Sequence, residues 1–258
     1  MKIAVCVKQI PDPATPYDLD PETHLVVRPN DQVLDDTDRY GVEMALQLAD
    51  ATEGEVTLVS MSPAGSFQGI RQALAMGADK AVVVDDETLR GSGALDTAKV
   101  LAAAIRREEP DLVIAGTESS DGYTGLVPQM LAELLDMPLL SFARKVEHGD
   151  GGLRVERQTA LGYDVVESGL PALVTVTSGV VEPRYPTFKG IMQAKSKPIE
   201  QPTVADLGLS ADKVGSAGSR QTITSVEPTP ERAAGTVIHD EGEAHLEIVK
   251  LLEQAKVI

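Results

Sequence analysis

The chain has 258 residues, of which 42% are hydrophobic and 3% aromatic, which suits one large α/β domain with an aliphatic core and an appendage. Its formal net charge of −17 repels phosphate backbones and anionic lipids, so we expect neither nucleic acid nor a membrane as a direct partner. The single cysteine, Cys6, excludes an internal disulfide, and no apolar run reaches the about 18 residues of a membrane span, so we expect a cytoplasmic protein.

The N-terminal part of the chain alternates short apolar runs with helical patterns. The runs predict buried strands at residues 2–10, 55–62, 80–85 and 111–116. Between the first and second of these, residues 24–35 are expected to form short extended pieces. Helices are predicted after an N-cap at Asp36 or Thr37, from Ser66 to Gly77, at 92–110 and at 124–135. This alternation predicts a doubly wound, mainly parallel sheet of the Rossmann-like or adenine-nucleotide α-hydrolase-like kind.

The pattern changes after Pro138. Strand candidates at 153–160, 162–168 and 172–179 follow one another without helices, which predicts antiparallel additions to the sheet. Residues 182–198 contain three prolines and show no regular period, and the chain then becomes rich in Ser, Thr, Gly and Pro. We therefore predict an α/β domain at 1–200 and an extended arm at 201–258, which ends in an amphipathic helix at 243–256 and docks on a partner chain.

The stretch "AGTESSDGYTGLV", residues 115–127, follows a predicted buried strand and leads into a helix. Its glycines let a ligand approach the backbone, and the amides at a helix N-terminus favour an anion. Lys8-Gln9 and residues 60–63 follow two other strands, so the three strand ends are expected to line one crevice. We interpret the crevice as a site that holds a nucleotide without transforming it; the alternative is an ordinary polar loop with a capped helix.

Residues 182–198 form a second candidate site. The segment carries four cations and no acid after Glu182 in an otherwise acidic chain: Arg184, Lys189, Lys195 and Lys197. It also contains the apolar residues Tyr185, Phe188, Ile191 and Met192. Basic residues around apolar anchors are typical of a docking site, and the alternative is a loop packed on the protein's own surface.

Several motifs, in the same order, resemble the β subunit of electron transfer flavoproteins. They are the N-terminal "AVCVKQIPD", the helix–turn–strand "IRQALAMGADKAVVV", the loop and helix "AGTESSDGYTGLVPQMLAELLDMP" and the segment "LPALVTVTSGVVEPRYPTFKGIMQAK". The resemblance extends over nearly the whole chain. It implies a carrier subunit rather than a stand-alone enzyme. The residues themselves agree, because no His lies near the three strand ends and no Cys/His cluster could hold a metal, so we expect no catalytic residue and no metal.

The resemblance also implies partners and cofactors. The chain would pair with an α subunit that holds most of a redox-active FAD, and this subunit would bind a structural AMP. Electrons would come from flavin dehydrogenases of the acyl-CoA dehydrogenase type, as in fatty acid β-oxidation, and pass to a membrane quinone oxidoreductase. Two alternatives stay open: a bifurcating electron transfer flavoprotein with a second FAD in this subunit, and a free-standing adenine-nucleotide-binding module.

The resemblance assigns residues to both sites. The AMP contacts would be Cys6, Asp35, Met61, Gly116, Thr117, Ser119, Ser120, Asp121, Gly122, Tyr123, Thr124, Gly125, Leu126 and Val127. The docking residues would be Arg184, Tyr185, Phe188, Lys189, Ile191 and Met192, with Phe188 as the apolar anchor. Two positions depart from the family pattern, because many relatives have Asn near Asp35 and Gln where Leu126 stands.

Overall fold

A computed structural model describes residues 1–62, 65, 67–149, 151–227, 229–231, 235 and 237–258. Pro63 and Ser66, which we assigned to the crevice and to a helix start, lie outside the described residues. The chain divides into two compact units, Met1–Ile223 and Thr224–Ile258. The boundary predicted at residue 200 therefore lies inside the first unit, where Val204 and Val214 are buried in the core.

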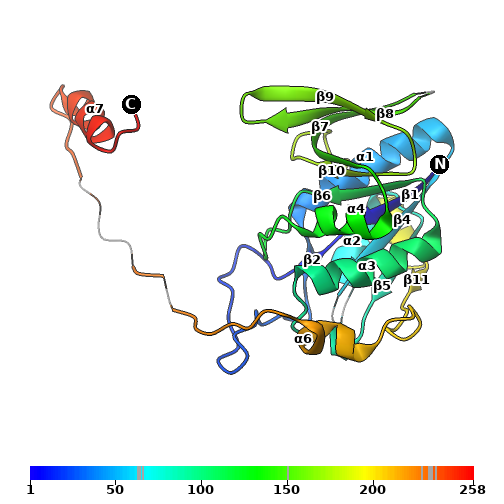
Figure 1. Ribbon diagram of the computed structural model, residues 1–258. Helices are drawn as coiled ribbons and strands as arrows, with labels where there is room; N and C mark the ends of the chain where they lie inside the picture. The colour runs from blue at the N-terminus through cyan, green and yellow to red at the C-terminus, as the bar shows by residue number, and fades with distance from the viewer. Residues whose placement is uncertain (63–64, 66, 150, 228, 232–234, 236) are drawn as a thin grey trace. The chain divides into compact units, whose positions relative to one another are not determined.

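A nine-stranded sheet is the centre of the first unit, as far as the described residues show it (Figure 1). From one edge to the other the strands are β11 (Ile199–Glu200), β5 (Lys80–Val84), β4 (Glu55–Met61), β1 (Lys2–Cys6), β6 (Leu112–Gly116), β10 (Ala172–Val176), β7 (Leu139–Gly149), β8 (Gly152–Thr159) and β9 (Gly162–Ser168). Neighbours from β11 to β7 pair in parallel, whereas β8 and β9 are antiparallel additions. This confirms the predicted α/β class and the antiparallel extension of the sheet.

Two strands differ from the prediction. The strand expected at 172–179 among the antiparallel additions is β10, which lies between β6 and β7 and pairs with both in parallel. All its residues are buried, so it has the continuous apolar character of a central parallel strand. β7 was not predicted, because a bulge near Phe142, whose φ is 54°, interrupts its alternation.

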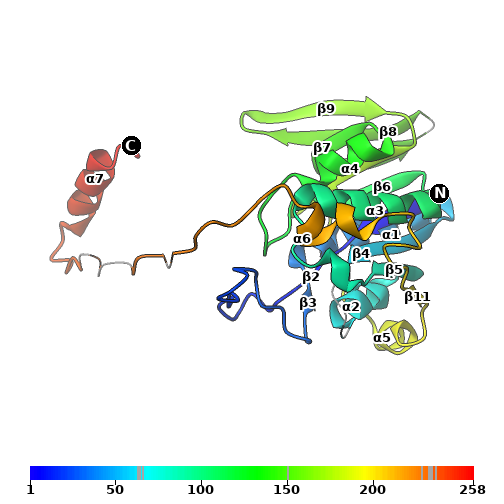
Figure 2. The same ribbon diagram turned by 60° about the horizontal axis from the view of Figure 1, so that its bottom comes forward.

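Four helices form the two layers that cover the sheet (Figure 2). α1 (Asp36–Thr52) and α2 (Gln68–Met76) pack in one apolar cluster with the sheet, and α3 (Ala94–Glu108) and α4 (Val127–Leu135) pack in the other. The N-cap of α1 is Asp35, one position before the expected Asp36. α4 begins at Val127 rather than Thr124, because Gly125 adopts a left-handed φ of 58°.

The remaining elements are short, apart from the last helix. They are β2 (Gln9–Ile10), β3 (Val33–Leu34), α5 (Phe188–Ala194), α6 (Gly215–Gly218), α7 (Ala244–Gln254) and two 3₁₀ turns, Glu87–Leu89 and Ala211–Lys213. The expected irregular segment 182–198 thus contains a helix, which Thr187 caps by accepting a hydrogen bond from the Gly190 amide at 3.0 Å. The predicted C-terminal helix is confirmed as α7, and its apolar side chains are exposed within the second unit.

Candidate functional site

A cavity of about 620 Å³ opens at the carboxyl ends of β1, β4 and β6. Its lining includes the ends of three strands and the residues that follow them: Cys6 to Gln9 from β1, Met61 and Ser62 from β4, and Ala115 and Gly116 from β6. In the sheet, β4 and β6 are the two neighbours of β1 and lie on opposite sides of it. The chain therefore adds β4 and β5 on one side of β1 and then crosses to the other side with β6. This is the point where strand order reverses, which is where open α/β sheets bind their ligands. The three strand ends expected to share a crevice do share one.

The N-termini of two helices meet at this cavity. Leu126 and Val127 at the start of α4 and Gly93 and Ala94 at the start of α3 all line it. Among the described side chains none caps either helix, so the first backbone amides, apart from position 128 where proline has none, are left to a ligand or water. The positive ends of two helix dipoles therefore favour an anion in the cavity.

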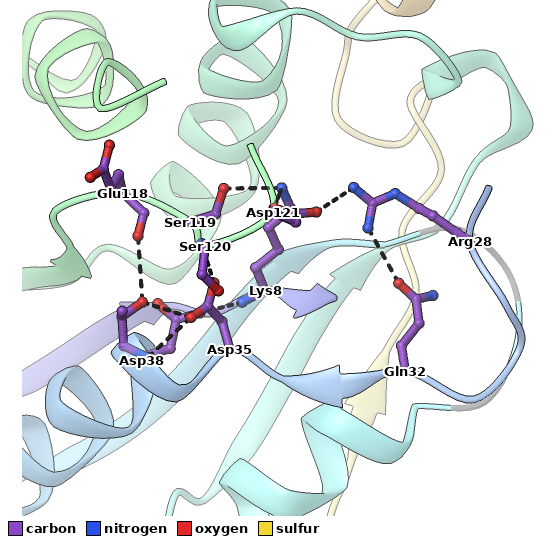
Figure 3. A network of polar contacts seen from close by, with 10 residues as sticks. Lys8, Arg28, Gln32, Asp35, Asp38, Glu118, Ser119, Ser120 and Asp121 are labelled. Atoms are coloured by element: carbon purple, nitrogen blue, oxygen red, sulfur yellow. Dashed lines mark hydrogen bonds and ion pairs between the residues drawn. The ribbon is translucent and has the colours of Figure 1, made fainter. Parts of the chain in front are cut away.

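The loop between β6 and α4 is held by a buried carboxylate, Asp121 (Figure 3). Its side chain is 1% exposed and forms ion pairs with Lys8 Nζ at 2.6 Å and Arg28 Nη2 at 2.5 Å. Lys8 Nζ also donates to Ser119 Oγ at 3.2 Å. Burial by itself would raise the pKa of Asp121, but Lys8 and Arg28 outweigh it and hold that pKa below its ordinary value. One ionised acid and two cations leave one positive charge in this cluster.

Asp35 fastens the same loop to the start of α1. Its side chain is buried and accepts hydrogen bonds from the Thr37 amide at 3.1 Å and from the Ser120 amide and hydroxyl at 2.7 and 2.9 Å. Both carboxylate oxygens of Asp35 therefore accept hydrogen bonds from groups of the same chain. Asp35 is therefore a cap and a loop anchor here, and the cavity is not lined by it.

Asp38, one turn later on α1, does line the cavity. Its Oδ2 accepts a hydrogen bond from the Lys8 amide at 2.7 Å. Burial, reinforced by the charge of Asp35, raises the pKa of Asp38 well above its ordinary value. Burial and the neighbouring Asp38 also raise the pKa of Cys6 to about 12, which keeps its thiol protonated and unreactive.

Most of the predicted nucleotide contacts are brought together. Ten line the cavity: Cys6, Met61, Gly116, Ser119, Asp121, Gly122, Thr124, Gly125, Leu126 and Val127. Four others do not: Asp35, Thr117, Ser120 and Tyr123. Sequence reasoning missed Arg28, Asp38, Arg90 and Gln221, which come from distant segments without a local motif.

The arrangement suits binding rather than chemistry. Within the described ranges no group of His, Cys, Asp and Glu is placed to hold a metal ion. Burial raises the pKa of both the Cys6 thiol and the Asp38 carboxyl, which opposes their activation as nucleophiles. In the same part of the chain no helix is long and apolar enough to cross a membrane.

The second candidate site, segment 182–198, presents its apolar residues outward. Tyr185 and Phe188 are 84% and 82% exposed, and Ile191 and Met192 are about half exposed. The cations divide into two groups. Arg184 pairs with acids of α1, and Lys197 donates to carbonyls at the end of α2, whereas Lys189 and Lys195 are exposed. The expected basic rim of four cations is therefore reduced to two.

Comparison with known proteins identifies the family. Residues 23–207 match the model of the electron transfer flavoprotein domain. The chain belongs to the electron transfer flavoprotein family. It is 41% identical to the electron transfer flavoprotein subunit beta of Mycobacterium tuberculosis, and the match covers 99% of each chain. It is 34% identical to the subunit beta of Thermoanaerobacterium thermosaccharolyticum over 100% of both chains.

A third relative has a different name. The caffeyl-CoA reductase-Etf complex subunit CarD of Acetobacterium woodii is 35% identical over 92% of each chain. Electron transfer by a flavoprotein is thus the role that family membership gives this chain. The designation of the relatives as subunit beta implies an α subunit as partner.

Proposed function

We propose that this chain is the β subunit of a heterodimeric electron transfer flavoprotein with a structural AMP in its cavity. It accepts electrons from flavin dehydrogenases of the acyl-CoA dehydrogenase type and passes them toward a membrane quinone oxidoreductase. FAD, held mainly by the α subunit, supplies the redox chemistry. The observation that carries the proposal is the cavity at the strand-order reversal, with two uncapped helix N-termini at its lining.

The residues of the cavity fit a nucleoside monophosphate. The amides at the starts of α3 and α4, with Lys8 and Arg28 near them, would hold the phosphate. Two glycines shape the loop: Gly125 adopts a left-handed φ, and Gly116 makes room for Asp38, because a Cβ on Gly116 would lie 3.1 Å from Asp38 Oδ1. The apolar part of the lining would cover the base, and it includes Val7, Leu25, Val26, Leu89, Leu101 and Leu131.

This chain therefore acts by position and electrostatics rather than as a catalyst. A phosphate at two helix N-termini would neutralise the one net positive charge of the Lys8, Arg28 and Asp121 cluster. The nucleotide would also fill the cavity between α3, α4 and the sheet. Binding of AMP to the folded state alone would stabilise the subunit.

A second candidate function is the bifurcating form, with FAD in the cavity in place of AMP. The volume of about 620 Å³ and a lining that extends to Arg90 and Gln221 favour this alternative, because a dinucleotide needs more room than AMP. A free-standing nucleotide-binding module is less well supported. The unit Thr224–Ile258 carries a helix whose apolar side chains are exposed, which suits a chain that docks on another.

The experiment that tests the site replaces Thr124 and Gly125 together by Val in the heterodimer. Val at Gly125 opposes the left-handed φ of 58°, and the two side chains would occupy the cavity where the loop lines it. We expect AMP to be absent from the purified double variant, while the FAD remains and is still reduced by dithionite. Gly149→Val is the control, because a Cβ there meets nothing within 4 Å. Full AMP content in the double variant would refute the site.

A further inference from the structure

The start of segment 182–198 is fastened to α1 by one acid. Arg184 donates from Nε to Glu43 Oε2 at 2.7 Å and from Nη2 to Glu43 Oε1 at 3.2 Å. The backbone amide of Arg184 donates to Oε2 as well, at 3.2 Å. Gln47, one turn further along α1, donates to Oε1 at 2.8 Å. Both carboxylate oxygens of Glu43 are thus used, and three of the four bonds come from Arg184.

Glu43 is buried, which makes this contact more than a surface ion pair. Its side chain is 4% exposed, whereas Asp50, which also meets Arg184 at 3.4 Å, is 73% exposed. Burial by itself would raise the pKa of Glu43, but Arg184 and Gln47 reverse the effect and hold the pKa below its ordinary value. A charged carboxylate at a buried position requires partners of this quality, so Arg184 is held in one place.

The middle and the far end of the segment are held by α2. A Cβ on Gly190 would lie 2.5 Å from the Ala75 carbonyl oxygen, so α5 and α2 are in close backbone contact. Lys197 Nζ donates to the carbonyls of Leu74, Gly77 and Ala78 at 3.1, 3.0 and 2.6 Å, at the C-terminus of α2. The short helix is therefore fixed before, along and after its length, and Figure 2 shows α5 beside α2.

The outward face of this fixed segment is apolar. Phe188 is 82% exposed, and Tyr185, Ile191 and Met192 project from the same short stretch. Ordering exposed side chains when a complex forms costs affinity, and a backbone held in advance removes part of that cost. The exposed Lys189 and Lys195 place positive charge beside these apolar side chains, although the chain as a whole has a net charge of −17. They therefore favour a partner surface with carboxylates around an apolar pocket.

We propose that Glu43 is a positioning residue for electron transfer: it holds Arg184 so that the apolar face of α5 meets the dehydrogenase in a preformed conformation. The inference rests on the proposed function, because it assigns segment 182–198 to a flavin dehydrogenase whose docking pocket is apolar and rimmed by carboxylates. Arg184 belongs to the support of the docking surface rather than to its charged rim.

The test is Glu43→Gln in the full heterodimer, with an acyl-CoA dehydrogenase and its acyl-CoA substrate as the electron source. Gln keeps the shape of the side chain but lacks the charge that holds Arg184. We expect the KM for the heterodimer to rise about tenfold while kcat stays within twofold, because only docking is affected. Hydrogen exchange of the amides of residues 184–194 should become faster, while the flavin and AMP contents do not change. Glu133→Gln is the control, because it removes the same negative charge from an exposed position on α4.

Two further variants separate the inference from the proposal on which it rests. Phe188→Ala should itself raise the KM, and adding Glu43→Gln to it should have a smaller effect than in the wild type, since both act through one surface. If Phe188→Ala leaves electron transfer unchanged, the docking assignment itself is wrong. If Phe188→Ala raises the KM but Glu43→Gln does not, only the positioning role is overturned. Should Glu43→Gln fail to fold, Arg184→Lys, which loses the forked contact, decides by the same measurements.

Discussion

Asp121→Asn removes the charge that joins the loop before α4 to Lys8 and Arg28, and keeps the shape of the side chain. A hydrogen bond to a charged group contributes about 1.5–3 kcal/mol when buried. Asp121 is 1% exposed, but the side chains of Lys8 and Arg28 are 36% and 28% exposed, and solvent weakens both pairs. We therefore expect a loss of about 2 kcal/mol for the two contacts together. For a unit of the size of Met1–Ile223, this corresponds to a fall in Tm of about 4–8 °C.

The same substitution should change nucleotide binding in the opposite direction. Asp35 still fastens the loop through Ser120, and Lys8 and Arg28 no longer share their charge with a carboxylate. We expect the heterodimer freed of nucleotide to melt at a lower temperature but to bind AMP a few-fold more tightly at low salt, with the gain reduced as salt rises.

The assay is calorimetric melting and AMP titration of the nucleotide-free heterodimer at two salt concentrations. Asp36→Asn is the control, because it removes the same charge from an 84% exposed side chain on α1. An unchanged Tm together with weaker AMP binding would refute the reasoning, since Asp121 would then contact the ligand directly instead of balancing the cations.

Three other predictions concern separate parts of the chain. The raised pKa of Asp38 means that, above about pH 4, the native state holds a proton that the unfolded state loses, so the free energy of unfolding falls as pH rises. Asp38→Asn should make this fall less steep, and an unchanged slope in urea melts would contradict the prediction. Gly190→Ala should destabilise the contact of α5 with the Ala75 carbonyl by about 1–3 kcal/mol, against no effect for Gly149→Ala in thermal melts. Ending the chain after Ile223 should leave a folded first unit that no longer co-purifies with the α subunit, and intact assembly would argue against the docking arm.

The regular part of the fold could be predicted because its signals are local. The strands β1, β5 and β6 are short aliphatic runs, β4 is a mainly buried run, and α1 to α4 show apolar stripes with recognisable ends. β7 was missed, because the left-handed residue Phe142 shifts its register and breaks the alternation. The central place of β10 was missed for another reason: strand order depends on crossover connections, which leave no periodic pattern.

The same distinction applies to the site. The proposed contacts between residues 116 and 127 lie on one contiguous stretch, so a single glycine-rich segment at a strand end was enough to predict residues that line the cavity. Arg28 and Asp38 reach the cavity only through long-range packing, and Arg28 lies in a segment of short extended pieces. Asp35 shows what the sequence leaves out, because only the structure reveals that its carboxylate accepts hydrogen bonds from Ser120 and Thr37.

The most direct test of the account is a count of cofactors in the heterodimer purified with its α subunit and denatured by heat. Released flavin and adenine nucleotide are separated by chromatography and compared with the protein concentration. The account predicts one FAD and one AMP per heterodimer, with AMP lost when Thr124 and Gly125 are both Val. Two FAD and no AMP would assign the cavity to a second flavin, and flavin without any second nucleotide would contradict the claim that the cavity is a nucleotide site.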